Sequence, residues 1–128
     1  MRYLLDTHTA FWEFTDSPEL SEKAKSIIDD SGNEIFVSIV SAWEIAIKRS
    51  LDREETTLCS VDEFLNEVTA SGFDLLTLGP SHVRPVETLP YHHRDPFDRL
   101  LIATAIAENM TFLSADENVA KYDVKWLW

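Results

Sequence analysis

The chain has 128 residues, which suits a single compact domain over 1–128 and is too short for two ordinary ones. Its 23 Asp and Glu against 11 Lys and Arg give a formal net charge of −12, which argues against long-range attraction to nucleic acid and favours a basic protein partner. One cysteine, Cys59, excludes an intramolecular disulfide, and no apolar run approaches the ~20 residues that span a bilayer, so we expect a cytoplasmic protein without a membrane partner.

Short apolar runs alternate with helical periodicities along the whole chain. Residues 18–30 show an apolar face at three- and four-residue spacing, and residues 95–109 begin with an Asp-Pro start signal. In chain order we predict a strand at 2–5, helices at 9–14 and 18–30, a strand at 34–37, helices at 41–51 and 61–70, a strand at 73–78, helices at 80–87 and 95–109, and strands at 111–114 and 124–127. This order predicts a three-layer α/β/α sandwich around a central, mostly parallel five-stranded sheet.

Four acidic residues lie where a predicted strand ends or the next helix begins. Asp6 ends the first strand, Asp116 follows the fourth, and Glu44 and Asp98 lie in first turns of predicted helices. Sites in open parallel sheets form outside the carboxyl ends of the strands. We therefore expect these carboxylates to meet at one edge of the sheet.

Helix capping explains each of these residues when it is taken singly. Ser41 and Glu44 have the spacing of a capping box, and Glu44 stands four residues before Lys48. Asp95 is a candidate N-cap for the helix that carries Asp98. Asp6 and Asp116 can each cap the helix that follows in the sequence.

Four carboxylates together need a further explanation, because two of them about 5 Å apart repel by roughly 3 kcal/mol at an effective dielectric near 20. A divalent cation removes this repulsion, and donors that are all oxygen suit Mg²⁺ or Mn²⁺. One or two such ions activate water for phosphodiester hydrolysis. The spacing therefore predicts an acidic metal site and leaves the substrate open.

Four segments resemble the motifs of PIN-domain ribonucleases, and in particular the VapC-type toxins of VapBC toxin–antitoxin pairs. They read LLDTH at 4–8, SAWEIAIK at 41–48, HHRDPFDRLLIA at 92–103 and LSAD at 113–116. The resemblance runs over essentially the whole chain, and the third segment is the most specific. It implies an endoribonuclease that uses one or two Mg²⁺ or Mn²⁺ ions, forms a homodimer and is neutralised by a VapB-like antitoxin with a basic segment.

Carried onto this chain, the resemblance assigns catalysis and metal binding to Asp6, Glu44, Asp98 and Asp116, with Thr7, Ser114 and Asp95 in support. Ser114 stands where the family commonly has threonine. Ala115 stands where arginine is frequent, which puts one basic substrate contact in doubt. The RNA contacts expected near the site are Lys48, Arg49, Arg53, His92, His93, Arg94 and Arg99.

Other functions remain open at this stage. The same carboxylates can cut DNA, and a PIN module can bind a protein or RNA without cutting. A phosphatase of the haloacid-dehalogenase type needs a second aspartate two positions after Asp6, where His8 stands. Zinc is not favoured, because the spacing of the histidines and Cys59 matches no zinc motif.

Overall fold

The computed structural model describes residues 1–51 and 59–128. Within these ranges one parallel sheet has the order β3-β2-β1-β4-β5, formed by β1 (Arg2–Leu5), β2 (Glu34–Ser38), β3 (Asp74–Leu76), β4 (Thr111–Leu113) and β5 (Trp126–Leu127). The helices are α1 (Thr7–Phe14), α2 (Glu22–Asp29), α3 (Ile39–Leu51), α4 (Val61–Ala70), α5 (Pro80–Val83) and α6 (Pro96–Glu108), with short 3₁₀ helices η1 (Arg84–Thr88) and η2 (Glu117–Lys121). The predicted fold class is confirmed.

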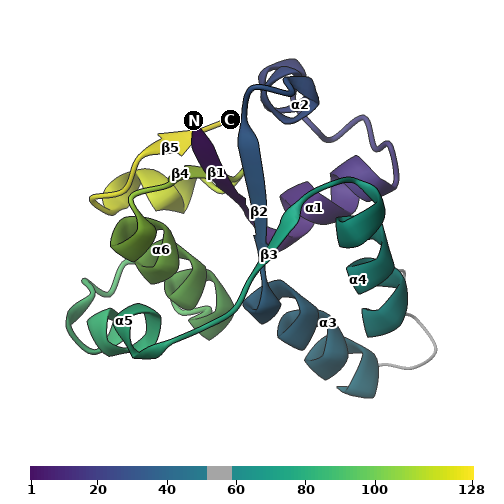
Figure 1. The fold of residues 1–128 in the computed structure, drawn as a ribbon. Coiled ribbons are helices and arrows are strands. Elements are labelled where there is room, and N and C mark those ends of the chain that lie inside the picture. The colour runs from purple at the N-terminus through teal and green to yellow at the C-terminus, as the bar shows by residue number, and fades with distance from the viewer. Residues whose placement is uncertain (52–58) are drawn as a thin grey trace.

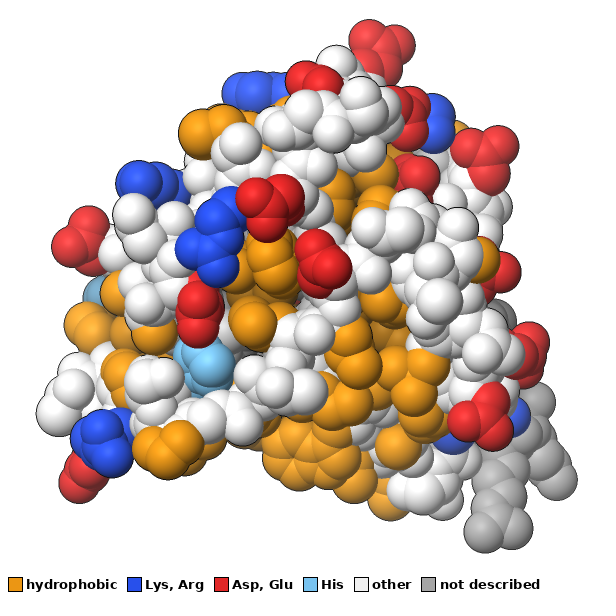
Figure 2. Space-filling model, viewed as in Figure 1, with side chains coloured by type: hydrophobic (Ala, Val, Ile, Leu, Met, Phe, Trp, Pro, Cys, Tyr) orange, Lys and Arg blue, Asp and Glu red, His pale blue; other side chains and the backbone are white. Residues whose placement is uncertain are grey.

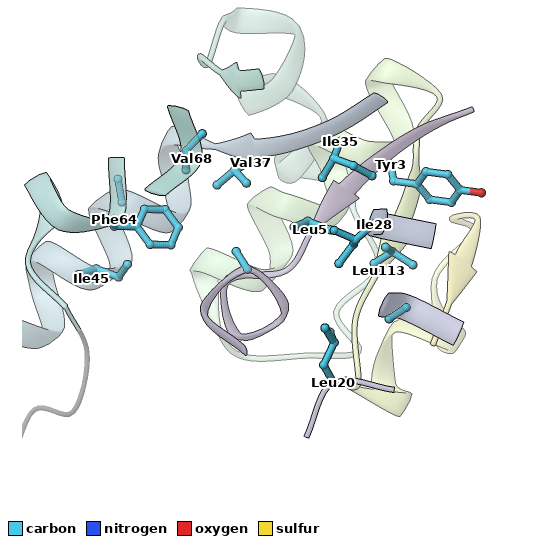
Figure 3. Close-up of a cluster of buried hydrophobic side chains, with 13 residues drawn as sticks. Tyr3, Leu5, Leu20, Ile28, Ile35, Val37, Ile45, Phe64, Val68 and Leu113 are labelled. Atoms are coloured by element: carbon cyan, nitrogen blue, oxygen red, sulfur yellow. The ribbon is translucent and has the colours of Figure 1, made fainter. Parts of the chain in front are cut away.

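Helices cover both faces of the sheet, as Figure 1 shows. Neighbouring residues of the central strand point to opposite faces, so that Leu5 enters one core and Leu4 the other, both fully buried. The core around Leu5 packs α1, α2 and α4 on the sheet and includes Phe64 and Val68 of α4 (Figure 3). The core around Leu4 is covered mainly by α6. Two apolar layers on one strand explain why β1 reads as a continuous apolar run.

Several element ends differ from the sequence prediction. Helix α1 begins at Thr7 rather than at residue 9, and α2 begins after its N-cap Ser21 rather than at residue 18. Strand β3 shortens from 73–78 to three residues, and the predicted helix 80–87 divides into α5 and η1. Across the described residues, the structure holds no helix long and apolar enough to cross a lipid bilayer.

The predicted capping box at the start of α3 is wrong. The helix begins at Ile39, directly after the last residue of β2. The Oγ of that residue, Ser38, accepts the N–H of Val40 at 3.0 Å and so supports the helix start. Glu44 therefore lies in the second turn of α3, with its side chain free of the backbone at the helix start. Its predicted pairing with Lys48 is present.

Candidate active site

The register of the sheet brings the ends of β1 and β4 to the same level. Leu5 pairs with Leu113, and the next residue along each strand is Asp6 or Ser114. The N–H of Asp6 donates to the carbonyl of Leu113 at 3.0 Å. The central strand therefore delivers a carboxylate to the carboxyl edge of the sheet, directly beside a hydroxyl.

Asp6 is a buried carboxylate with a hydrogen bond on each oxygen. The Oγ of Ser114 donates to Oδ2 at 2.7 Å, and the N–H of Thr7 donates to Oδ1 at 2.7 Å. Burial raises the pKa of Asp6 above its ordinary value, and the charge of Glu44 adds to this, although the two hydrogen bonds oppose it. The fold thus holds a carboxyl group where its charge is poorly solvated.

Glu44 approaches the same region from α3 and is 3% exposed. The hydroxyl of Thr7 donates to Oε1 at 2.9 Å and lies 2.8 Å from the Oγ of Ser41. Lys48 donates to Oε2 at 2.6 Å. Burial by itself would lower the pKa of Lys48, but the hydrogen bond to Glu44 and nearby negative charges raise it above its ordinary value. Lys48 is therefore held as a cation against Glu44.

Asp98 lies in the first turn of α6. Asp95 caps this helix, and its Oδ1 accepts the N–H of Asp98 at 3.3 Å. Burial raises the pKa of Asp98 to about 8, and negative neighbours add to the rise. These neighbours are Asp6, Asp95, Glu44 and Asp116. Asp98 therefore lies in the combined field of all the predicted acidic residues.

His93 lies between Asp98 and Asp116. Its Nε2 is 3.0 Å from Oδ2 of Asp116 and 3.3 Å from Oδ2 of Asp98. The Oδ1 of Asp116 accepts the N–H of Asn118 at 2.9 Å and so caps η2. The ligand atoms of the histidine and the two aspartates lie within 4.8 Å of one another, in half-buried surroundings.

An open hollow of about 330 Å³ lies beside these groups. Three of the carboxylates line it together with His8 and Trp12. The two rings stack at 5.7 Å between centroids and 26° between planes. The hollow therefore combines acidic and aromatic lining residues. Its lining residues are Asp6, His8, Trp12, Asp98, Ala115 and Asp116.

The chemistry of this donor set fits a hard divalent cation. Carboxylate oxygens are the ligands that Mg²⁺ and Mn²⁺ prefer. The raised pKa values of Asp6 and Asp98 mark carboxyl groups whose negative charge is poorly compensated by the protein. A bound cation supplies the missing positive charge.

The four predicted acidic residues therefore come together from separate parts of the chain. Asp6, Asp98 and Asp116 line the hollow, and Glu44 is linked to the same edge by Thr7. The supporting residues lie beside them: Thr7 bonds to both Asp6 and Glu44, Ser114 bonds to Asp6, and Asp95 caps α6.

The predicted RNA contacts fall into different environments. Arg94 and His92 are exposed, Lys48 is half-buried against Glu44, and Arg49 is half-buried on α3. Arg53 lies outside the described residues.

Arg99 requires a correction, because it is only 7% exposed. Its guanidinium donates to the carbonyls of Pro90 and Leu89 at 2.9 and 3.2 Å and lies 4.5 Å from the ring centroid of Tyr91. Arg99 is thus engaged in holding the preceding loop, and we do not retain it as a proposed RNA contact.

The sequence interpretation did not find two features of this site. His93 was expected to face phosphate, whereas it contacts two carboxylates. His8 and Trp12 stack on each other and also line the hollow. Their four-residue spacing on a helix that follows Asp6 is the signal that could have placed them on one face beside it.

Comparison with known proteins identifies the family. Residues 3–125 match the model of the PIN domain, so the chain belongs to the PIN-domain family. PIN domains are generally metal-dependent nucleases. A search of curated proteins gave no match.

Solved structures share the fold at low sequence identity. VapBC2 from Rickettsia felis bound to a DNA fragment from its promoter matches with a TM-score of 0.73 and 14% identity, over 100% of this chain and 99% of that one. DNA-bound VapBC from Salmonella typhimurium gives 0.68 and 10%, over 99% and 97%. VapBC-1 from nontypeable Haemophilus influenzae gives 0.65 and 13%, over 99% and 97%.

Proposed function

We propose that this PIN-domain protein is a metal-dependent endoribonuclease of the VapC type, the toxin of a toxin–antitoxin pair. The observation that carries the proposal is the environment of Asp98, whose pKa rises to about 8 through burial and the charges of carboxylates from other segments. Perturbed carboxyl groups that line a hollow are typical of functional sites. The family and the oxygen-only donors support a nuclease over the phosphatase alternative.

In this proposal Asp6, Asp98 and Asp116 hold one or two Mg²⁺ or Mn²⁺ ions, and Glu44 completes the acidic set. A metal held there would supply an activated water and would stabilise charge on the phosphate. The chain's own residues position the ligands: Ser114 and Thr7 each donate to one oxygen of Asp6, and Asp95 fixes the start of α6.

The hollow supports a single-stranded substrate. The exposed face of His8, stacked on Trp12, offers an aromatic surface beside the carboxylates for an unpaired base. Basic and histidine side chains then contact the phosphates and offset their repulsion by the negative net charge of the chain. The proposed contacts are Lys48, Arg49, His92 and Arg94, whereas His93 is engaged with Asp98 and Asp116.

We propose two protein partners as well. A VapB-like antitoxin with a basic segment is supported by the likeness to VapBC complexes and by the net charge of −12. A homodimer is supported by apolar side chains along α3, where Trp43, Ile47 and Leu51 are 51%, 36% and 81% exposed. Figure 2 shows a broad apolar area in the lower part of the view, over and beside α3.

The test of the enzymatic proposal is incubation of the purified chain with total cellular RNA in Mg²⁺, Mn²⁺ or EDTA. The variants are Asp98→Asn, which keeps the shape of the side chain, and Asp62→Asn, a control in the first turn of α4. We expect discrete RNA fragments from the wild type and from Asp62→Asn, and intact RNA with Asp98→Asn or with EDTA.

Other outcomes separate the alternatives. Cutting that persists in Asp98→Asn contradicts the assigned site. Preferential cutting of single-stranded DNA in a parallel reaction favours the DNA nuclease. Intact nucleic acid with a folded wild type, free of antitoxin, favours a PIN module that binds without cutting.

The dimer is tested separately by light scattering. Ile47→Glu on α3 should yield a monomer, whereas Ile106→Glu on α6 is a matched control, because Ile106 is 40% exposed on another surface. A wild type that is already monomeric at micromolar concentration contradicts the dimer and leaves the nuclease proposal intact.

A further inference from the structure

We propose that His93 is a positioning residue of the acidic site, which holds the carboxylates of Asp98 and Asp116 together: its Nε2–H donates to Asp116, and Asp98 lies 3.3 Å from the same nitrogen. The inference rests on the proposed function, because it assigns to His93 the task of converging two of the proposed metal ligands.

His93 approaches both carboxylates with a single ring nitrogen. Nε2 of His93 lies 3.0 Å from Oδ2 of Asp116 and 3.3 Å from Oδ2 of Asp98, so one ring nitrogen faces one oxygen of each carboxylate. The two aspartates come from different elements, η2 and α6. His93 therefore bridges two segments at the point where their carboxylates approach.

The hydrogen bonds of His93 determine which of its ring nitrogens carries the hydrogen. The backbone N–H of Asp95 donates to Nδ1 of His93 at 3.0 Å, so Nδ1 must offer a lone pair. The ring is then neutral, and its hydrogen resides on Nε2, facing the two carboxylates. A nitrogen that carries this hydrogen is a donor to carboxylates and has no lone pair left for a metal. His93 therefore acts through the aspartates and is not itself a ligand.

Hydrogen bonds to other elements hold the loop that carries His93. Arg99 of α6 donates to the carbonyls of Leu89 and Pro90, and the hydroxyl of Tyr122 accepts the N–H of His92 at 3.2 Å. The two bonds from Arg99 tie the loop to the helix that carries Asp98, and the third ties it to Tyr122 at the end of η2. The ring of His93 is thus fixed relative to both carboxylates, as a positioning role requires.

The contacts of His93 bear on how tightly the two aspartates would bind a cation. A bound cation would draw on Asp98 and Asp116 as two negatively charged ligands that repel each other, and a donor between them would offset part of this repulsion. Hydrogen-bond partners of metal ligands commonly contribute about 10–100-fold to metal affinity. We expect His93 to contribute in this range, because it touches two ligands.

The experiment uses two variants that divide the functions of the ring. His93→Gln places an amide N–H₂ near the position of Nε2 and loses the acceptor at Nδ1. His93→Asn places an amide oxygen near Nδ1 and loses the donor at Nε2. Mn²⁺ affinity is measured by the loss of the free-Mn²⁺ electron paramagnetic resonance signal, and folding by thermal unfolding in EDTA. His92→Ala, on the same loop and in contact with Tyr122, is the control.

We expect His93→Asn to weaken Mn²⁺ binding by about 10–100-fold. His93→Gln and His92→Ala should remain within about threefold of the wild type, less than the lower end of that range. The reverse order, with Asn retaining affinity and Gln losing it, overturns the inference in favour of loop support through Asp95. Wild-type affinity in all folded His93 variants also overturns it, while the proposed metal site stands. A wild type that binds no Mn²⁺ overturns the proposed function and this inference together.

Discussion

Helix α6 carries a carboxylate at each end, and the two are shifted in opposite directions. Asp98 at the start and Glu108 at the end have similar side-chain exposure, 22% and 29%. Burial and the charges of other carboxylates raise the pKa of Asp98 to about 8. Hydrogen bonds from His82, and to a smaller extent from Arg2, lower the pKa of Glu108.

The comparison separates the edge of the sheet that carries the candidate site from the opposite edge. At the amino edge, Glu108 lies 2.7 Å from Nε2 of His82 and 3.4 Å from Arg2, so a hydrogen bond and an ion pair fasten α6 to α5 and to β1. At the carboxyl edge, like charges are held together by the surrounding fold. Burial is the largest cause of the rise at Asp98, with the charges of other carboxylates adding to it, whereas hydrogen bonds from His82 and Arg2 outweigh burial at Glu108.

The largest expected difference between the two ends is in catalysis. Asp98→Asn should reduce the rate of RNA cleavage by more than about 100-fold, because even indirect partners of a metal contribute up to that amount. Glu108→Gln should stay near the wild-type rate at a temperature where it is folded. Cleavage rates on one labelled RNA measure both. Equal losses at the two ends would remove the distinction between them.

Metal binding should stabilise the folded protein only through the end of α6 that carries Asp98. Mg²⁺ or Mn²⁺ at 100 times its dissociation constant should raise the free energy of unfolding by about 2.7 kcal/mol relative to EDTA. Glu108→Gln should gain as much as the wild type, and Asp98→Asn much less. Urea unfolding with and without metal measures this gain. A full gain in Asp98→Asn would contradict Asp98 as a ligand.

The pH dependence in EDTA should also have opposite signs at the two ends. The folded state keeps the proton of Asp98 between the ordinary pKa of 3.8 and about 8, while the unfolded chain has released it. Stability therefore falls as pH rises through this window, by about 2 kcal/mol in all for a half-buried group. Asp98→Asn should remove this slope. A wild-type curve that rises from pH 5 to 8 would show that Asp98 is not shifted upwards.

The smallest expected effect is at the amino edge. Glu108→Gln should lower the free energy of unfolding by about 1 kcal/mol at pH 7, because partly exposed charged hydrogen bonds contribute modestly. Since the pKa of Glu108 is lowered, this contribution is present above the ordinary value of 4.5 and is lost as pH falls below it. The difference between variant and wild type should therefore shrink near pH 3 in urea unfolding.

The sequence predicted the fold and the acidic set because both follow from local rules. Apolar runs mark the strands, and a parallel sheet brings residues that follow its strands, such as Asp6 and Asp116, to one edge. Boundaries were less predictable. The start of α3 depends on a single hydrogen bond at Ser38, two residues before the more conspicuous capping pattern.

The contacts of His93 could not be predicted from the sequence, because they join three segments. Asp116 reaches His93 from 23 residues further along the chain, and Asp98 reaches it from the next helix. Only the tertiary position of the loop, fixed by Arg99 and Tyr122, decides which of its histidines meets the carboxylates. The sequence offered His92 and His93 as equals, and the structure distinguishes them.

Two of the acidic residues, Asp6 and Asp116, also begin helices by accepting a backbone N–H. This double use has a practical consequence for testing the proposed function. Alanine at either position removes the charge and the cap together, so a loss of folding would be mistaken for a loss of activity. Asparagine exchanges a single oxygen for nitrogen and can still cap. A folded protein for capturing the proposed partners should therefore be made with asparagine.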